Sequence, residues 1–470
     1  MIALLLAAAW AAPTLAPLDG FPYPVSAATL DNGLTVWVQP RPDATSVVGY
    51  VVVRAGSRYE DEQTSGASHL LEHMLFVQTA RWTEPEVRRL IERTGGVYNG
   101  YTYPERVGYY ARLPAGQTEA LIDWLDQVVF QPQLPEEKLG KEREVVFEER
   151  GGRDGWTLRA VHRLGLGLSD DDAIRADLWP DSTRRLRVIG EDQSLDSITI
   201  DGLRGFYHGH YTPRNATLIV VGPEDPERVL TLAAEHLGGL PAGARRSPPD
   251  DTGPSPALGG TVNLTQLWVA DQCAVTLGAR GPGLASRDVW VATVAMTYLE
   301  IGLNDTLRIQ RGLTYGVSAV ASPQSDSGEL RIQADLNCRN VDAATTAFRE
   351  ALAALRRAEI NTDWLERARG LSAGRWAISQ EDSTQRASWL ASRVVLDDPT
   401  QNADWRRAIP QVDDAQLAAL ANTWLTDDAT RIWVTRPILT IAQAWIATAA
   451  LASLVVGLIL RRKLRTRRPT

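Results

Sequence analysis

Residues 69–73 read His69-Leu70-Leu71-Glu72-His73, a spacing with direct consequences for metal binding. On a helix, residues four positions apart lie on one face, so both imidazoles can reach a single ion. Two neutral imidazoles suit Zn²⁺, and Glu72 beside them can accept a proton from a water molecule that the metal activates. The pattern therefore predicts a helix with two zinc ligands and a general base. The alternative is a pair of histidines whose only role is in the packing of a helix.

A third zinc ligand is expected, because a catalytic zinc usually has three protein ligands and one open position. The candidates lie in one acidic run. As a helix, this run places Glu142 and Glu149 on one face, seven positions apart. The chemistry of the residues does not separate these carboxylates from one another, or from a solvated acidic helix surface. The four candidates are Glu142, Glu144, Glu148 and Glu149.

The composition is that of an ordinary folded protein. The chain has 470 residues, of which 44% are hydrophobic and 23% charged, and its length allows two or three domains. A net charge of −8 argues against a nucleic-acid-binding surface. The two cysteines, Cys273 and Cys338, are too few for a disulfide scaffold or a cysteine-based zinc site. An oxidising compartment would allow them to pair, but two buried free thiols are the favoured interpretation.

Both ends of the chain carry topological signals. Ile438 to Leu460 is an uncharged run of 23 residues, long enough to cross a bilayer. Six basic residues follow it without an acidic one, which marks the cytoplasmic side. The apolar run from Ile2 to Ala12 is similar to a signal peptide, although no basic residue precedes it. We therefore predict a signal peptide at 1–15, a transmembrane helix at 438–460 and a basic cytoplasmic tail at 461–470, with the rest of the chain on the periplasmic or cell-envelope side.

The region between these ends predicts an α+β fold with an internal repeat. Asn215–Val221 is similar to Asp428–Val434, and the helix near 289–299 lacks both histidines. A duplicated unit in which only the first copy keeps the metal residues explains both observations. We expect a first domain at 20–237, a Gly- and Pro-rich linker at 238–260 and a second domain at 261–436. The predicted strands are 47–53, 107–113, 216–221, 266–269 and 274–277, and the predicted helices are 84–92, 117–130, 136–149 and 287–299, with a turn at 279–283.

The order H-x-x-E-H is that of the inverzincin metallopeptidases, and the sequence around it resembles the pitrilysin/insulysin family. The resemblance is to the half-length branch that includes mitochondrial processing peptidase, and it covers most of residues 30–225 and part of the second half. It implies two similar α+β domains, each a mainly antiparallel sheet backed by helices. The matching stretches are Asn32-Gly33-Leu34, Ala55–Glu60, His69–Phe76, Gly95–Asn99 and Asn215–Gly222.

The resemblance also implies a complete metal site. The family's third ligand is a glutamate about 76 residues beyond the second histidine, in the pattern E-R-x-V-x-x-x-E. Glu149 follows His73 by 76 residues, and Glu142 opens that pattern. The implied set is one Zn²⁺ per chain held by His69, His73 and Glu149, with Glu72 as general base, Glu142 as a supporting carboxylate behind the ligands, and Glu148 as the alternative ligand.

Two further matches concern the substrate. Asn99-Gly100-Tyr101-Thr102 resembles the family's N-A-x-T edge strand, with Gly100 in place of alanine, and implies that Asn99, Gly100 and Tyr101 bind the substrate backbone. Arg308 and Tyr315 resemble the family's R-x(6)-Y pair, which helps to stabilise the tetrahedral intermediate. Taken alone, they are simply a structural arginine and a strand tyrosine.

The predicted function is that of a membrane-anchored zinc endopeptidase that hydrolyses peptides or unfolded polypeptides outside the cytoplasm. In full-length relatives the Arg/Tyr pair lies on the opposite half of a clam-like chamber, so we expect Arg308 and Tyr315 to serve the zinc site of a partner chain. A homodimer is favoured and a heterodimer remains open. The alternatives are a non-catalytic partner or scaffold subunit, and a tethered module that holds zinc structurally. His208-Gly209-His210 has no acidic partner and is not expected to bind a second metal.

Overall fold

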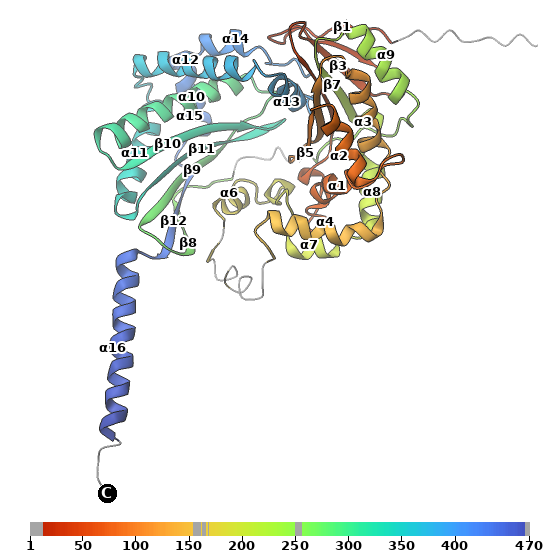
Figure 1. Ribbon diagram of the computed structural model, residues 1–470. Coiled ribbons are helices and arrows are strands. Elements are labelled where there is room, and N and C mark those ends of the chain that lie inside the picture. The colour runs from red at the N-terminus through yellow and green to blue at the C-terminus, as the bar shows by residue number, and fades with distance from the viewer. Residues whose placement is uncertain (1–12, 154–160, 162–165, 168, 250–255, 466–470) are drawn as a thin grey trace, which may run out of the picture.

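The computed structural model describes residues 13–153, 161, 166–167, 169–249 and 256–465. Residues 1–12 of the predicted signal peptide and residues 466–470 of the predicted basic tail lie outside the described residues, whereas 461–465 continue the last helix. In the described part, two sheets stand side by side with helices packed on them, and one long helix extends from the second sheet (Figure 1).

Each half of the chain builds one sheet. The first contains β1 Ala16–Pro17, β2 Ser26–Thr29, β3 Thr35–Pro40, β4 Ser46–Val53, β5 Val97–Thr102, β6 Val107–Pro114 and β7 Ala216–Gly222. The second contains β8 Thr261–Val269, β9 Gln272–Pro282, β10 Thr314–Pro323, β11 Ser327–Asn337 and β12 Thr430–Leu439.

The two sheets share one topology. The order β3-β7-β4-β6-β5 in the first sheet corresponds to β8-β12-β9-β11-β10 in the second. In each sheet the first pair of this order is parallel and the remaining pairs are antiparallel. The similar segments at 215–221 and 428–434 lie on β7 and β12, which occupy equivalent positions. This agrees with the expected two-domain α+β fold built on mainly antiparallel sheets.

Helices cover both sheets. In the first half they are α1 Ala67–Leu75, α2 Glu84–Arg93, α3 Thr118–Phe130, α4 Glu136–Glu149, α6 Asp170–Leu178, α7 Asp192–Ser197, α8 Ile200–His210 and α9 Pro226–Leu237. In the second half they are α10 Val289–Leu303, a π-helical segment η4 Asn304–Gln310, α11 Val341–Arg356, α12 Thr362–Ser379, α13 Ser383–Arg393, α14 Trp405–Ala408, α15 Asp414–Trp424 and α16 Ile441–Arg465. Short 3₁₀ turns lie at Ser57–Tyr59, Thr183–Arg185, Pro213–Asn215, Cys338–Asn340 and Ile409–Gln411.

The two halves exchange helices. One face of the first sheet packs on α1, α3 and α9, whereas its other face packs on α13 from the second half, with Leu390 against Val52 and Ile219. Conversely, α6 from the first half packs on the second sheet, where Ile174 lies among apolar residues that include Trp433. Central strands β4 and β7 are therefore buried on both faces, which explains their continuous runs of valine and isoleucine.

A buried ionic cluster also joins the halves. Arg58 pairs with Glu105, which lies in the turn between β5 and β6. Its other guanidinium nitrogen is 2.7 Å from a carboxylate oxygen of Asp326, which lies in the turn between β10 and β11. Arg184 pairs with the same Asp326, and the backbone N–H of Ser325 donates to Glu105 at 2.8 Å. Two edge hairpins, one from each sheet, are thus held together at their tips.

The favoured interpretation of the cysteines is wrong. Cys273 on β9 and Cys338 just after β11 form a disulfide, with their Cα atoms 4.9 Å apart. The physical reason is the antiparallel pairing of β9 with β11, which aligns Cys273 with Leu336 and brings together two residues 65 positions apart. Sequence spacing alone carried no sign of this pairing.

Two predicted boundaries also differ. The turn expected at 279–283 is mostly strand, because β9 pairs with β11 as far as Pro282. Glycine at 281 leaves room for the Leu330 side chain on β11, because a Cβ at this position would lie 2.7 Å from Cγ of Leu330. The apolar helix begins at Ile441 rather than at 438, because Leu439 still pairs with Val269 as the last residue of β12.

Candidate metal centre

Helix α1, which carries the two histidines, is positioned by a buried carboxylate. Its N-cap residue Gly66 has no side chain to cap the helix, and Glu60 takes this role. The backbone N–H groups of Gly66 and Ser68 donate to the Glu60 carboxylate at 2.8 and 2.7 Å, so unpaired groups at the helix start are satisfied. Burial raises the pKa of Glu60 to about 7. In the sequence, Glu60 appeared only as part of a matching stretch, without a role.

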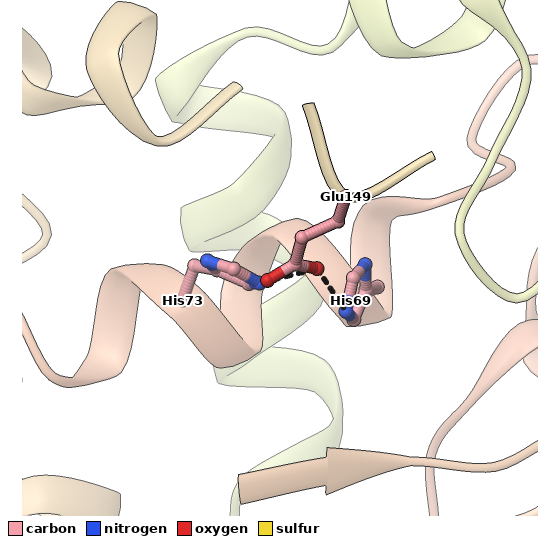
Figure 2. Close-up of side chains that lie close together, drawn as sticks. All are labelled: His69, His73 and Glu149. Carbon is pink, nitrogen blue, oxygen red and sulfur yellow. Dashed lines mark ion pairs between the residues drawn. The ribbon is translucent and has the colours of Figure 1, made fainter. Parts of the chain in front are cut away.

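The face of α1 that carries His69 and His73 lies against Glu149, the last residue of α4. In Figure 2 the Glu149 carboxylate lies between the two imidazole rings. One of its oxygens is 3.6 Å from Nε2 of His69 and 3.5 Å from Nε2 of His73. With zinc bonds of about 2.0–2.2 Å, ligand atoms of a tetrahedral site lie roughly 3.4 Å apart, so this spacing fits one zinc ion. Within the described part of the chain, this is the single group of at least three such side chains close enough to share a metal.

The two histidines differ in their pKa, and that of His69 favours the neutral imidazole that binds a metal. Burial, with a smaller effect of the neighbouring His73, lowers the pKa of His69 to about 4, so its imidazole is neutral at pH 7. Burial would lower the pKa of His73 as well, but the contact with Glu142 and the charge of Glu149 raise it above its ordinary value. Glu142 lies 3.7 Å from Nδ1 of His73, on the side of the ring away from Glu149. It can therefore orient the ring, as a carboxylate behind a metal-ligating histidine does.

Glu72 lies beside the trio and is held by a strand. The Thr102 hydroxyl on β5 donates to Oε2 of Glu72 at 2.6 Å. Burial raises the pKa of Glu72, and the hydrogen bond from Thr102 opposes that shift. A Cβ at Gly100 would lie 2.6 Å from Oε1 of Glu72, so glycine at this position leaves room for the carboxylate. Side chains alternate along a strand, so residues 100 and 102 lie on one face. This spacing is the sequence signal that could have identified Thr102 as a neighbour of Glu72.

The metal trio and Glu72 border a cavity of about 590 Å³. Strand β5 forms one wall and is the last strand of its sheet, so one of its backbone edges is unpaired. The residues expected to bind substrate, Asn99, Gly100 and Tyr101, all line this cavity. The Tyr101 ring, however, packs against Tyr50 and Tyr103. An apolar part of the wall, which sequence reasoning missed, is formed by Phe76, Tyr98, Val188 and Ile189.

The structure does not bring Arg308 and Tyr315 to this cavity. They contact each other, with the guanidinium 5.1 Å from the centre of the tyrosine ring, and the Tyr315 side chain is 89% exposed. Both belong to the second half, on η4 and β10, and neither lines the metal cavity.

Three other candidate ligands stand apart from the trio. Glu148 is exposed on α4 and does not join the group. Nδ1 of His210 donates a hydrogen bond to the carbonyl of Phe206 at 2.9 Å, and the His210 ring stacks on that phenylalanine. His208 lies beside Tyr207, in a ring contact of 5.4 Å. Within the described residues, neither His208 nor His210 belongs to a group of three side chains close enough to share a metal.

Comparison with protein families gives two matches that divide the chain. Residues 35–159 match the model described as insulinase, peptidase family M16. Residues 197–371 match the model described as peptidase M16 inactive domain. The first match contains the whole metal trio, and the second contains Arg308 and Tyr315.

Curated relatives extend the similarity over most of the chain. A protein of Mycobacterium leprae named an uncharacterized zinc protease is 30% identical over 367 residues, which are 77% of this chain and 80% of that protein. The probable mitochondrial-processing peptidase subunit beta of Arabidopsis thaliana is 29% identical over 202 residues, 43% of this chain and 36% of that one.

Solved structures share the fold. A protease from Helicobacter pylori superposes with a TM-score of 0.77 at 21% identity, over 88% of this chain and 99% of that one. The periplasmic protease PqqL from Escherichia coli superposes with a TM-score of 0.69 at 21% identity, over 90% of this chain but only 48% of that one.

Proposed function

This chain belongs to the insulinase family of peptidases, M16, and on that basis we propose that it is a membrane-anchored, zinc-dependent endopeptidase acting on peptides or unfolded polypeptides outside the cytoplasm. The observation that carries the proposal is the convergence of His69, His73 and Glu149 at zinc-ligand spacing, with Glu72 beside them. Relatives named zinc proteases support both the metal and the reaction at the level of the family.

The metal trio, Glu72, Thr102 and strand β5 each have a role in this mechanism. Zinc, when bound by the trio, supplies the Lewis acid that activates a water molecule. Glu72 accepts a proton from that water at its carboxylate and returns it to the leaving amine. The Thr102 hydroxyl fixes the direction of the carboxylate. The free edge of β5 pairs with the backbone of the substrate, which selects for an extended chain more than for particular side chains.

Helix α16 supports the membrane anchor. It is the one helix in the described residues that is long and apolar enough to cross a bilayer, over Ile441–Leu460, and none of that window is buried in the fold. The basic residues that follow would stay on the cytoplasmic side, which leaves both sheets outside the cytoplasm. The Cys273–Cys338 disulfide supports this orientation, because disulfides persist in oxidising compartments.

Zinc content tests the proposed metal site. We expect the purified full chain to hold one zinc per chain, and Glu149→Gln to weaken zinc binding by more than about 100-fold, beyond the loss typical of a residue behind the ligands. The matched control is Glu148→Gln, which makes the same change at the adjacent exposed carboxylate and should retain the metal. Elemental analysis after dialysis against a graded chelator measures both. Loss of zinc from Glu148→Gln with retention in Glu149→Gln would contradict the ligand assignment.

Thr102→Val should shift the pH dependence of cleavage. Glu72 must be ionised to accept a proton, so activity rises as the pH rises through its pKa. The hydrogen bond from Thr102 lowers that pKa, and its removal should move the acidic limb of the kcat/KM profile to higher pH. The control is Thr231→Val on the exposed face of α9, where the profile should not move. An unchanged acidic limb in Thr102→Val would argue against Glu72 as the base.

A dimer would complete the site. The exposure of Tyr315 and its distance from the cavity lining suit action on a partner chain, and PqqL contains a second region of similar length that this chain does not cover. The relative named a peptidase subunit also supports pairing. We propose a homodimer in which Arg308 and Tyr315 face the zinc site of the other copy, with a heterodimer of two half-length chains as the alternative.

Mixing two inactive variants tests this exchange. Glu72→Gln lacks the base and Tyr315→Phe lacks the phenol, so a mixed dimer regains one intact site. Random re-association of equal amounts should restore about one quarter of wild-type activity, because half of the dimers are mixed and each has one working site of two. Two affinity tags verify that mixed dimers form. Confirmed mixed dimers without activity would exclude the exchange.

A further inference from the structure

Five apolar side chains are exposed where the second sheet meets α16. Trp268 and Val269 are each 50% exposed, and Leu267, Ile438 and Ile441 are each 46% exposed. Single exposed apolar residues are common on soluble proteins. These five gather at one end of the second sheet, because Val269 at the end of β8 pairs with Leu439 at the end of β12, next to Ile438. We refer to these five residues as the foot.

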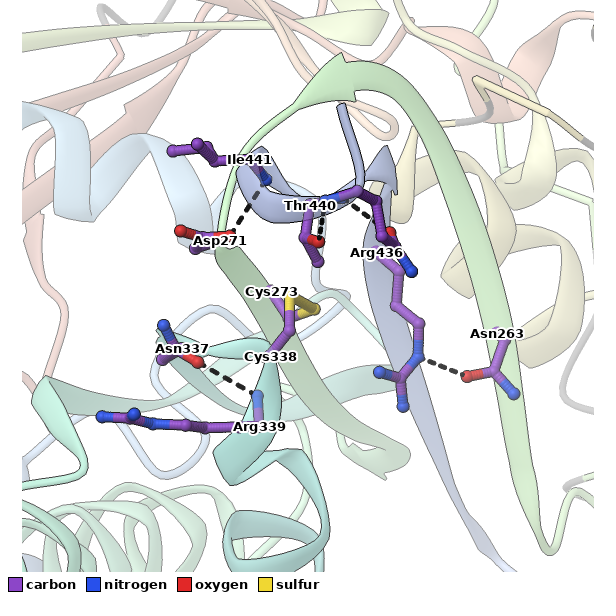
Figure 3. The surroundings of a disulfide bond; sticks show 10 residues. Asn263, Asp271, Cys273, Asn337, Cys338, Arg339, Arg436, Thr440 and Ile441 are labelled. Atoms are coloured by element: carbon purple, nitrogen blue, oxygen red, sulfur yellow. Dashed lines mark hydrogen bonds between the residues drawn. A yellow bond between two sulfur atoms is a disulfide. The ribbon is translucent and has the colours of Figure 1, made fainter. Parts of the chain in front are cut away.

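The foot is joined to α16 without a flexible linker. Only Thr440 separates β12 from the helix. The backbone N–H of Ile441 donates to Oδ1 of Asp271 at 3.1 Å, so the turn between β8 and β9 caps the helix (Figure 3). The N–H of Ala270 donates to the carbonyl of Leu439 at 3.3 Å. The start of the helix is therefore fixed to the turn that follows β8, the strand that carries Trp268.

The disulfide strengthens the same junction. Cys273 follows the turn by two residues and forms the disulfide with Cys338 (Figure 3). Cys338 donates its backbone N–H to the carbonyl of Asp271 at 2.9 Å. The turn is thus tied to β11 covalently and by a hydrogen bond. The disulfide and this hydrogen bond therefore fix Asp271, the residue that caps α16, to the body of the sheet.

The length of α16 places the foot at the surface of a bilayer. Its apolar window spans Ile441–Leu460, 20 residues. At 1.5 Å per residue this is about 30 Å, the thickness of the hydrocarbon layer. The layer therefore begins at the first turn of the helix. The end of β8 reaches the same depth, because Val269 pairs with Leu439 on the neighbouring strand, about 4.8 Å away. Tryptophan favours the membrane interface, and Trp268 together with Trp445 on the helix would occupy it.

We propose that the foot is a lipid-contact surface that enters the interfacial region of the outer leaflet and fixes the height and tilt of both sheets above the membrane. This rests on the proposed membrane span of α16. The occupant is phospholipid, because the exposed apolar side chains lie beside the first turn of that apolar helix. The polar caps at Thr440 and Asp271 limit the depth, since their hydrogen bonds belong at the level of the headgroups.

Quenching by brominated lipid tests the proposal on the full chain. Both native cysteines are paired, so a single introduced thiol can carry a fluorophore in vesicles of phosphatidylcholine and phosphatidylglycerol. The test position is Trp268→Cys, with Val269→Cys as a second position if labelling at 268 lowers the yield. Leu454→Cys in the middle of α16 reports on the span itself. Ile378→Cys is the matched control, because it is 70% exposed on α12, at the end of the same half away from α16 (Figure 1).

We expect lipids brominated near the headgroup to remove about half or more of the emission at 268, since interfacial apolar groups lie about 5–10 Å into the boundary of the headgroups. Emission at 378 should not change. Quenching at 454 by lipids brominated deep in the acyl chains, with a 268 signal that matches 378, would overturn the proposal and leave the membrane span intact. No quenching at 454 by these deep-brominated lipids would overturn the span and the proposal with it. Energy transfer between labels at 268 on two copies, without quenching by lipid, would identify a second copy as the occupant and also overturn it.

Discussion

Replacing Glu72 by glutamine is expected to lower kcat for an internally quenched peptide by about 10²- to 10⁴-fold, the range that general base catalysis contributes. The glutamine has nearly the same shape, and its amide oxygen can still accept the Thr102 hydroxyl. It cannot accept a proton, so the activation of water is lost while the cavity keeps its form. Zinc content and KM should stay close to those of the wild type, because Glu72 is not one of the three residues that share the metal position.

Glu92→Gln is the control, since it makes the same substitution on α2 at a side chain that is 56% exposed. It should cleave the peptide as the wild type does, and a chelator should abolish cleavage in both. Equal cleavage by Glu72→Gln and the wild type would rule out the proposed base. Loss of zinc from Glu72→Gln would show that the carboxylate has a different role.

Replacing Glu105 by glutamine is expected to have the largest effect on stability. The substitution removes the carboxylate charge that pairs with the almost fully buried Arg58 in the cluster described above. Removal of one charged partner from a buried ionic cluster costs about 3 kcal/mol. We expect the free energy of unfolding in urea to fall by this amount, and the two halves to separate earlier because Glu105 joins the tips of two hairpins.

The matched control for this prediction is Glu359→Gln. Glu359 forms two hydrogen bonds with Arg357 but lies on the surface, so its loss should not change the unfolding midpoint. Circular dichroism during urea titration of the detergent-solubilised chain measures both variants. A Glu105→Gln midpoint equal to that of Glu359→Gln would mean that the cluster contributes nothing to holding the halves together.

Local patterns in the sequence were sufficient for much of the fold. The continuous valines of β4 identified a strand buried on both faces, and the acidic run at 136–149 formed the expected helix α4. The similarity between 215–221 and 428–434 pointed to strands that take equivalent places in two sheets. These features depend on residues close in the chain, where the period of the side chains directly sets which face they occupy.

Tertiary contacts between residues far apart in the chain could not be predicted from local sequence patterns. The exchange of α6 and α13 between the sheets depends on how two whole halves pack, and no short pattern records it. The disulfide depends on the register of β9 and β11, and a difference of one residue would have put the thiols on opposite faces. The capping of α1 by Glu60 depends on a loop that folds back over the helix start.

The sequence by itself determined the chemistry of the site: two imidazoles four residues apart and a carboxylate between them, which a helix places on one face whatever surrounds it. Residue types could not choose among the carboxylates of α4, and only the resemblance pointed to Glu149. The tertiary structure placed Glu149 and not Glu148 between the imidazoles, because the packing of α1 on α4 sets which glutamate reaches them. It also placed Arg308 and Tyr315 away from that cavity and paired the cysteines, because those distances depend on how separate elements pack and not on spacing along the chain.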